Sequence, residues 1–361
     1  MTIDNRLWST KAKSLTPYVP GEQPKHDNLC KLNTNENPFP PSPKAVAAMQ
    51  VVLADDAAAL RLYPEPESDG LRQALAAYYG LDSSEVFVGN GSDEVLALVF
   101  ACFFTKDKPL LTPDISYSFY PVYADTFGVA AQTVPLADDF SIHVADYAQP
   151  CDGVILANPN APTGRLLPLD DIRTLLSQHP DAVVVIDEAY IDYADDVKAA
   201  SAISLIREFD NLVVTQTFSK SRALAGLRVG MAFANPSLIA ALTAMKNSFN
   251  SYPLDRVAQA GAAASVADVE YFESRRTEVI HLRNQLTADL TALGFDVLPS
   301  AANFVFATKQ GTDAADIAAK LREDGVIVRH FKQARIKDYL RISVGTAAQN
   351  ARLIEVLKQV L

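Results

Sequence analysis

Short apolar runs, many of them β-branched, alternate with helical segments through the middle of the chain. Runs of about five such residues, bounded by turn signals, are typical of buried strands. Strands that alternate with helices favour the α/β class, a mostly parallel central sheet with helices on both faces. We expect buried strands at residues 129–134, 153–157, 182–186, 212–215 and 229–233, and helices between them at 169–178 and 203–209.

The two ends of the chain differ in texture from its middle. Residues 1–42 are polar and then rich in proline, which favours extended chain and predicts an arm that lies on another surface. A long helical stretch at 255–293 begins a smaller α+β unit. We therefore expect an arm at 1–42, a large domain at 43–254 and a small domain at 255–361. Further expected helices are 44–60, 68–79, 95–104, 313–323 and 347–360, and further expected strands are 85–89, 109–113, 296–298, 304–307, 326–329 and 339–345.

Polar motifs follow several of the expected strands. They occupy residues 89–93, 158–164, 187–190 and 217–220. Functional residues of open α/β sheets gather beyond the carboxyl ends of the strands. Each motif alone has an ordinary structural explanation, but their shared position at one edge of one sheet predicts a functional site there.

A lysine stands at one of these strand ends, in the stretch NLVVTQTFSKSRALAGLRVGMAFA. Two hydroxyl residues, Thr217 and Ser219, precede Lys220, and Arg228 follows it by eight residues. Such groups can hold a phosphate beside an amine. A lysine becomes a nucleophile for Schiff-base chemistry when desolvation and neighbouring cations lower its pKa. Taken alone, the stretch is equally compatible with a surface loop that carries an incidental lysine.

Asp187 comes directly after a buried apolar run, so its carboxylate is expected at a buried strand end. A buried carboxylate needs a cationic partner, and a protonated pyridine nitrogen would be one. Tyr190 could donate to an oxygen on the same ring, and the amides of Asn158 and Asn160 in the next loop could do likewise. Ser92 and Asp93 follow a strand and a glycine turn at a helix start, which is an anion-binding arrangement, although any βα junction can carry it.

The composition argues against several other classes of protein. The net charge is −11, from 32 basic and 43 acidic residues, which does not indicate a nucleic-acid-binding surface. The three cysteines form no CxxC pair and the five histidines show no ligand spacing, so we expect neither a disulfide framework nor a metal site. The first residues lack the apolar core of a secretory signal, and the longest apolar run, 96–104, is too short to span a bilayer. We expect a cytoplasmic protein that binds neither nucleic acid nor membrane.

The motifs NPNAPTG, DEAYIDY, TFSKSRALAGLRVG and LRISVG together resemble a fold-type I pyridoxal-phosphate aminotransferase of class I/II. The N-terminal LNTNENPFPPSP and the later YPEP make the chain similar to the histidinol-phosphate aminotransferase family. The resemblance covers nearly the whole chain in order. It implies the cofactor pyridoxal 5′-phosphate, a homodimer with shared active sites, and an arm that packs on the small domain and the partner subunit. The implied reaction converts histidinol phosphate and 2-oxoglutarate to imidazole-acetol phosphate and glutamate, in histidine biosynthesis.

The resemblance also implies roles for individual residues. Lys220 would form the Schiff base with the cofactor, Asp187 would pair with the pyridine nitrogen, and Tyr190 would bond the ring hydroxyl oxygen. Arg341 would receive the anionic end of the substrate. Tyr117 would stack on the ring, the phosphate would be held by Ser92, Asp93, Thr217, Ser219 and Arg228 together with Tyr63 of the neighbouring subunit, and further substrate contacts would come from Tyr18, Asn35 and Arg329.

The sequence departs from the family pattern at Ala161, where an asparagine that bonds the ring hydroxyl oxygen is usual. Either Asn158 or Asn160 compensates, or Tyr190 holds that oxygen without it. His330 and Phe331 stand where more polar residues are expected, and they could favour an aromatic amino acid over an imidazole phosphate ester. A phosphothreonine decarboxylase-like lyase is a further alternative. A pyridoxal-phosphate-binding regulator would need an upstream DNA-binding domain, for which the first 42 residues are too few.

Overall fold

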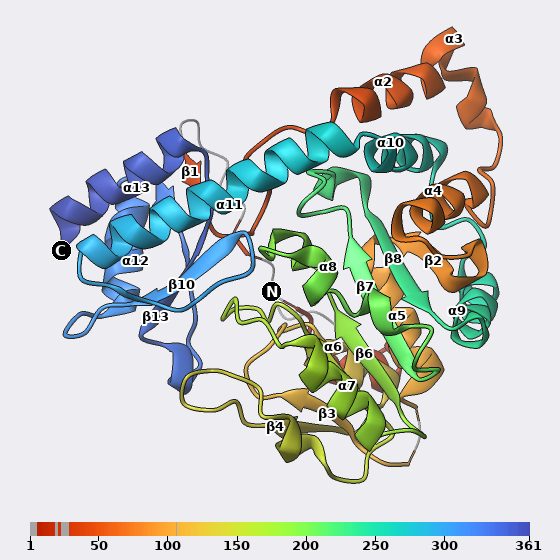
Figure 1. Ribbon diagram of the computed structural model, residues 1–361, viewed down its shortest axis with the longest axis horizontal. Helices are drawn as coiled ribbons and strands as arrows, with labels where there is room; N and C mark the ends of the chain where they lie inside the picture. Colours follow the sequence, from red (N-terminus) through yellow and green to blue (C-terminus); the bar gives the residue numbers. More distant parts are fainter. Residues whose placement is uncertain (1–5, 19–20, 23–28, 106) are drawn as a thin grey trace.

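The computed structural model describes residues 6–18, 21–22, 29–105 and 107–361. Figure 1 shows a large unit built on a twisted sheet and a smaller unit that contains α12 (Ala314–Glu323) and α13 (Ala347–Val360). The long helix α11 (Val269–Ala292) runs from the large unit to the small one. Among the described residues, no helix combines the length and the apolar character that crossing a membrane requires.

The sheet of the large unit confirms the expected α/β class. Only β8 runs antiparallel to its neighbours, and every other adjacent pair of strands is parallel. The carboxyl ends of the parallel strands therefore meet at one edge. In spatial order the seven strands are β2 (Val86–Asn90), β8 (Val229–Ala234), β7 (Leu212–Thr217), β6 (Val183–Asp187), β5 (Gly153–Ala157), β3 (Leu110–Pro113) and β4 (Ala131–Val134).

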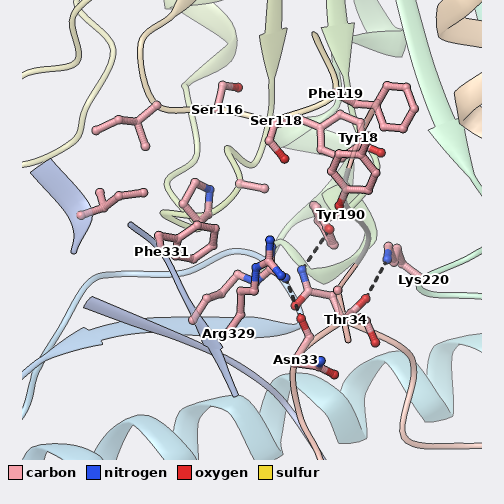
Figure 2. A pocket seen from close by; sticks show the side chains of 18 of the residues that line it. Tyr18, Asn33, Thr34, Ser116, Ser118, Phe119, Tyr190, Lys220, Arg329 and Phe331 are labelled. Atoms are coloured by element: carbon pink, nitrogen blue, oxygen red, sulfur yellow. Dashed lines mark hydrogen bonds between the residues drawn. The ribbon is translucent and has the colours of Figure 1, made fainter. Parts of the chain in front are cut away.

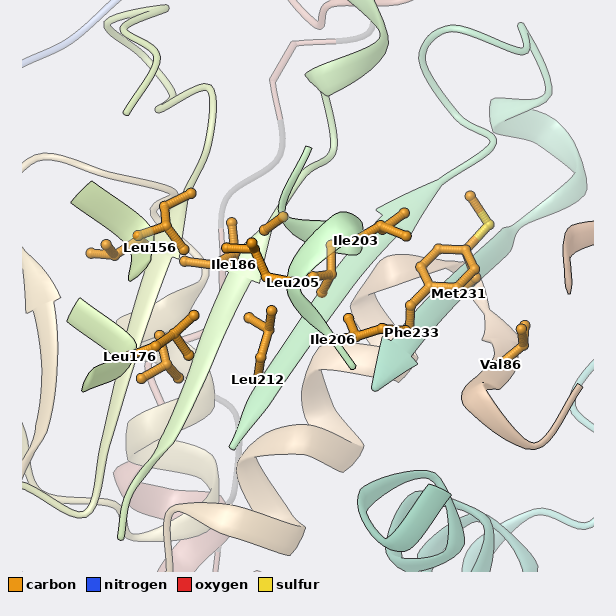
Figure 3. Close-up of a cluster of buried hydrophobic side chains, with 14 of the residues drawn as sticks. Val86, Leu156, Leu176, Ile186, Ile203, Leu205, Ile206, Leu212, Met231 and Phe233 are labelled. Carbon is orange, nitrogen blue, oxygen red and sulfur yellow. The ribbon is translucent and has the colours of Figure 1, made fainter. Parts of the chain in front are cut away.

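The central strands of this sheet are buried on both faces. Successive side chains of a strand point to opposite faces, and both sets pack into hydrophobic clusters. In β6, Val184 and Ile186 join the hydrophobic cluster shown in Figure 3, where α7 (Leu169–Gln178) and the turn η5 (Ala202–Leu205) cover the sheet. Val183 and Val185 join the cluster on the other face. Helices α5 (Gly91–Phe103), α6 (Tyr120–Phe127) and α9 (Pro236–Phe249) cover that second face.

The small unit has a four-stranded antiparallel sheet with a hydrophobic core of its own. The N-terminal segment contributes to this unit, since β1 (Cys30–Lys31) pairs with β11 (Val326–Ile327) and Leu32 lies in its core. The order of the four strands is β12 (Arg329–His330), β13 (Tyr339–Ser343), β10 (Phe304–Thr308) and β9 (Asp296–Val297).

Several expected elements differ from the observed ones. The strand at 129–134 is observed as β4, which is largely exposed because it lies at the edge of the sheet. The helix expected at 203–209 is only the short turn η5. The strand expected at 326–329 divides into β11 and β12, because the chain changes partner from β1 to β13 at Val328. Helix α9 was not expected from the sequence.

Two long helical predictions are also interrupted. The helix expected at 44–60 ends at Val52, and Asp55, Asp56 and Ala57 then adopt left-handed backbone angles. The stretch 255–293 breaks at Asp268 into α10 (Arg256–Ala267) and α11. Helix α10 packs against α2 (Pro43–Val52) and α4 (Asp69–Tyr79) in the large unit.

Candidate active site

Two adjoining cavities lie at the carboxyl ends of the parallel strands. The inner cavity has a volume of about 210 Å³ and reaches Asp187 at the end of β6. The outer cavity, of about 530 Å³, opens toward Arg329 and Arg341 of the small unit. Seven residues line both cavities, so the two form one continuous site: Thr34, Asp93, Tyr117, Ala161, Tyr190, Lys220 and Arg228.

Lys220 projects into this site from the turn that follows β7. Its Nζ donates to the carbonyl oxygen of Thr34 at 3.2 Å and lies 5.7 Å from the centre of the Tyr190 ring (Figure 2). The Nδ2 atom of Asn37 donates to the carbonyl oxygens of Lys220 and Ser221, at 3.1 Å in each case. The N-terminal segment therefore contacts both the amine and the backbone of this lysine.

Asp187 is fully enclosed at the floor of the inner cavity. Its carboxylate accepts hydrogen bonds from the Tyr120 hydroxyl at 2.9 Å and from Thr215 Oγ1 at 3.0 Å. Burial raises the pKa of Asp187 to about 6, although these two hydrogen bonds act in the opposite direction. A cation in the inner cavity would favour the ionised form of this carboxylate.

The N-terminus of α5 and Arg228 form one wall of the site. Arg228 donates to the Asp93 carboxylate at 3.1 Å and approaches Ser219 Oγ at 3.5 Å. This close approach needs glycine at two positions. A Cβ atom at Gly91 would lie 2.5 Å from Arg228 Nη2, and one at Gly230 would lie 2.3 Å from the backbone nitrogen of Ser92.

This wall offers the donors that an anion requires. Ser92 stands in the first turn of α5, where backbone N–H groups are free and the helix dipole favours negative charge. The hydroxyls of Thr217 and Ser219 lie 2.9 Å apart beside it. Helix N–H groups, hydroxyls and a guanidinium together are a donor set suited to a phosphate.

An aromatic wall faces the lysine. The Tyr117 hydroxyl donates to Asp93 at 3.2 Å, and the Tyr117 ring packs edge-on to Tyr120 with the ring centres 5.5 Å apart. These contacts fix the orientation of the Tyr117 ring. In the outer cavity, Tyr18 packs on Phe119 with ring centres 4.8 Å apart (Figure 2).

Two arginines from neighbouring strands enter the outer cavity. Arg341 on β13 donates to the carbonyl oxygen of Asn33 at 2.9 Å. Within the described part of the chain, its buried Nε atom has no hydrogen-bond partner. Burial lowers the pKa of Arg341, and the nearby Arg329 acts in the same direction. An anion bound here would offset both effects.

Three of the sequence-predicted residues do not line either cavity. The amide of Asn158 bonds to the backbone of Leu167, and the amide of Asn160 bonds to the carbonyl oxygen of Ile115 and to Thr163. The Asn158 amide is thus used within its own loop, whereas the Asn160 amide also ties that loop to Ile115 and Ser116 in the loop after β3. Ala161 is the residue of the 158–164 loop that lines both cavities. Tyr63 is 77% exposed and stacks on Tyr252, away from the site of its own chain.

Sequence reasoning did not identify several residues that build the site. Thr215 holds Asp187: it is the last residue of the strand expected at 212–215, and in the structure it pairs with Asp187 in the register of β6 and β7. Tyr120, the second donor to Asp187, was not identified either. Asn33 and Thr34, in the N-terminal segment, contact Arg341 and Lys220 at opposite ends of the site. Asn33 is 308 residues from Arg341 in the sequence, and Thr34 is 186 residues from Lys220. No local pattern indicates such contacts.

The chain matches a family model described as aminotransferase class I and II over residues 27–357. It is 67% identical to histidinol-phosphate aminotransferase 2 of Psychrobacter arcticus, over 99% of this chain and 96% of the relative. It is 58% identical to the histidinol-phosphate aminotransferase of Acinetobacter baumannii strain SDF, over 99% of this chain and 98% of the relative.

Solved structures of aminotransferases also resemble this chain. The fold resembles the crystal structure of histidinol-phosphate aminotransferase from Sinorhizobium meliloti in complex with pyridoxal-5′-phosphate, with a TM-score of 0.82 at 27% identity. The similarity covers 92% of this chain and 91% of that one. A Thermus thermophilus aspartate aminotransferase shares the fold, with a TM-score of 0.81 at 22% identity and 92% of each chain covered.

Proposed function

The chain belongs to the class I and II aminotransferase family, and from this premise we propose that it exchanges an amino group between histidinol phosphate and 2-oxoglutarate. The products are imidazole-acetol phosphate and glutamate, and the reaction belongs to histidine biosynthesis. The enzyme depends on pyridoxal 5′-phosphate, as its family does. The observation that carries the choice of substrate is the pairing of two arginines, Arg329 and Arg341, at the far end of a cavity that begins at Lys220.

The inner cavity fits this cofactor by the chemistry of its donor set. Asp187 would hold a protonated pyridine nitrogen, because no cationic side chain in the described part of the chain pairs with its buried carboxylate. Tyr117 would cover one face of the ring, and Tyr190 would donate to the ring hydroxyl oxygen. The phosphate would be held by the wall described above, formed by Ser92, Asp93, Thr217, Ser219 and Arg228.

Pyridoxal phosphate, when bound, supplies an aldehyde that condenses with amines and a ring that withdraws electrons from the substrate's Cα. Lys220 would supply the amine that holds the cofactor in the site, and its Nζ would serve as the general base that takes the proton from the substrate's Cα. The Thr34 carbonyl and Asn37 hold this lysine from its two ends, which keeps the amine directed into the site.

The outer cavity supports recognition of an anionic substrate. Arg341 can form a bidentate contact with either a carboxylate or a phosphate, so it can serve both half-reactions in turn. Phosphate recognition needs further donors, and Arg329 and Tyr18 line the same cavity. Asn35 also lines it. The aromatic lining from Phe119 and Phe331 supports a flat ring in the substrate, which suits both an imidazole and the ring of an aromatic amino acid.

We propose that the active unit is a homodimer in which Tyr63 reaches the phosphate site of the partner subunit. The exposure of Tyr63 on a proline-flanked turn supports this, as does the exposure of other apolar side chains close to Tyr63 and to its stacking partner Tyr252 in the sequence. Side chains with at least 43% exposure in residues 51–62 and 249–252 are Val51, Leu53, Leu60, Leu62, Phe249 and Tyr252. The division into an arm (1–42), a cofactor domain (43–254) and a small domain (255–361) belongs to the same proposal, although α10, at the start of the last range, packs on α2 and α4 of the cofactor domain. A cytoplasmic location also belongs to it, and the free thiols of Cys30, Cys102 and Cys151 support that location.

A substrate panel tests the proposed function. Purified protein loaded with pyridoxal phosphate is offered histidinol phosphate, histidinol, phenylalanine and phosphothreonine, each with 2-oxoglutarate. Glutamate formation and carbon dioxide release are both measured. Histidinol phosphate is expected to give the highest kcat/KM for glutamate formation, without carbon dioxide. Efficient use of phenylalanine with inert histidinol phosphate would instead support an aromatic aminotransferase, the alternative that Phe331 in the outer cavity favours.

A further inference from the structure

Asn35 connects the hydroxyl of Tyr190 to strand β13. Its Nδ2 donates to the Tyr190 hydroxyl oxygen at 3.0 Å. Its Oδ1 accepts from Ser343 Oγ at 2.9 Å, and its backbone N–H donates to the same Ser343 Oγ at 2.8 Å. Since Ser343 Oγ accepts the backbone N–H, its own hydrogen goes to Oδ1 of Asn35, and the amide NH₂ group faces Tyr190.

The surroundings hold Asn35 in this orientation. The residue is 1% exposed, and its carbonyl oxygen accepts from Asn303 Nδ2 at 3.0 Å. Its φ angle of 56° lies in the left-handed region, which asparagine adopts more readily than most residues. Contacts from both backbone and side chain thus fix the amide before any ligand binds.

This orientation determines what Tyr190 can donate. A phenol carries one hydrogen, and Tyr190 already accepts a hydrogen bond from Asn35, so its hydrogen is available to an acceptor in the cavities that it lines. Ala161 lies next to Tyr190 in the lining of both cavities, and the two residues pack in one apolar cluster. A methyl group there offers no hydrogen-bond donor.

We propose that Asn35 is a positioning residue that directs the Tyr190 hydrogen toward the ring hydroxyl oxygen of the bound cofactor. Tyr190 then supplies the hydrogen bond that an amide at position 161 would otherwise give. The inference rests on the proposed function, since it needs pyridoxal phosphate in the inner cavity. In this proposal Asn35 influences the protonation of the bound cofactor through Tyr190, and it does not act by contacting the substrate.

The test is the pH at which the absorbance of the loaded protein changes between its protonated and unprotonated forms. In Asn35→Asp the carboxylate accepts the Tyr190 hydrogen, so the cofactor oxygen loses its donor and this pH midpoint rises by about 1 unit. Tyr190→Phe raises it similarly, and the double variant Asn35→Asp/Tyr190→Phe shows no further rise. Adding Ala161→Asn to Asn35→Asp supplies a new hydrogen-bond donor, so the pH midpoint falls most of the way back to the wild-type value.

Two further variants complete the design. Asn350→Asp is the matched control. Asn350 is buried, and among the described residues its side chain bonds only through Oδ1, which accepts the Gly345 N–H. The pH midpoint of this variant is expected to equal that of the wild type. Ser343→Ala frees the Asn35 amide without adding charge, and we expect it to raise the pH midpoint by less than Asn35→Asp does. It serves as the test if Asn35→Asp does not fold. An unchanged midpoint in the folded variants, or a rise that Ala161→Asn does not reverse, overturns the inference. Wild-type protein that takes up no cofactor overturns the proposed function as well.

Discussion

Arg329 and Arg341 lie directly opposite each other on the antiparallel strands β12 and β13. Their guanidinium carbons are 5.6 and 5.7 Å from the centre of the same ring, that of Phe331. Two cations on adjacent positions repel each other unless an anion lies between or beside them. The pair is therefore most stable when a phosphate or carboxylate occupies the outer cavity.

Replacement of Arg341 by lysine should weaken both half-reactions. Lysine keeps the charge but loses the planar fork, and the loss of one hydrogen bond to a charged group removes about 1.5–3 kcal/mol. We expect kcat/KM to fall by about 10- to 150-fold for histidinol phosphate and for glutamate alike. A fall for only one of the two substrates would contradict the shared role.

Arg329→Ala should separate the two substrates. A phosphate can use both arginines, whereas the smaller charge of a carboxylate can be satisfied by Arg341 alone. We expect KM for histidinol phosphate to rise, by about tenfold if one charge-assisted contact is lost, with KM for glutamate unchanged. Lys332→Ala is the matched control, since Lys332 is an exposed cation three residues away that does not line the cavity. An equal effect of both variants would indicate a general charge effect instead.

Lys220 should be the site of covalent attachment of the cofactor. Borohydride reduction of the purified, loaded protein should abolish its visible absorbance and fix the cofactor on one peptide. Mass spectrometry should find the added mass on Lys220. Lys220→Ala should show no such adduct, whereas the exposed Lys198→Ala should behave as the wild type. An adduct that persists in Lys220→Ala would disprove the assignment.

The sheet and the position of the site could be predicted because both depend on local patterns. The runs around Ile155, Val185 and Val213 are buried on both faces, and their apolar character marks strands whatever else the chain does. Polar residues directly after such strands, such as Asp187, must lie at the shared edge. The strand at 129–134 was predicted to be buried and is largely exposed, because nothing in the local sequence distinguishes an edge strand from a central one.

The contacts of the N-terminal segment could not be predicted in the same way. Asn35 meets Ser343 at a separation of 308 residues, and Asn37 meets Lys220 at a separation of 183. Such contacts depend on how β1 joins the small unit, and two-residue strands such as β1 leave almost no periodic signal. The buried hydrogen bonds of the Asn158 and Asn160 amides, which keep them from lining the cavities, likewise depend on the final path of their loop.

Asp187 should make the stability of the cofactor-free protein depend on pH. Its pKa is raised from 3.8 to about 6 by burial, so the folded state holds the proton more tightly than the unfolded state. This contribution to stability is present at low pH and is lost as the pH rises through about 6. Asparagine cannot ionise, so the free energy of unfolding of Asp187→Asn should improve relative to the wild type by about 1 kcal/mol between pH 5 and pH 7.

Denaturant unfolding of both cofactor-free proteins at the two pH values measures this difference. Glu188 is buried nearby and its pKa is also raised, to about 7, but it is present in both proteins and its effect cancels. A stability difference between the two proteins that is the same at pH 5 and pH 7 would refute the prediction. The same Asp187→Asn variant should hold pyridoxal phosphate more weakly at neutral pH, because a neutral amide cannot pair with a protonated ring nitrogen.

The shared active site of the proposed homodimer can be tested by mixing two defective proteins. Tyr63→Ala retains Lys220 but lacks the residue given to the partner, and Lys220→Ala has the opposite defect. A mixed dimer then contains one complete site, made of Lys220 from one protomer and Tyr63 from the other. Random exchange makes half of the dimers mixed, so activity should recover to about one quarter of the wild-type value. Lys198→Ala mixed with Lys220→Ala controls for exchange. If exchange is demonstrated by mass and activity stays at the mean of the separate variants, Tyr63 acts within its own chain or not at all.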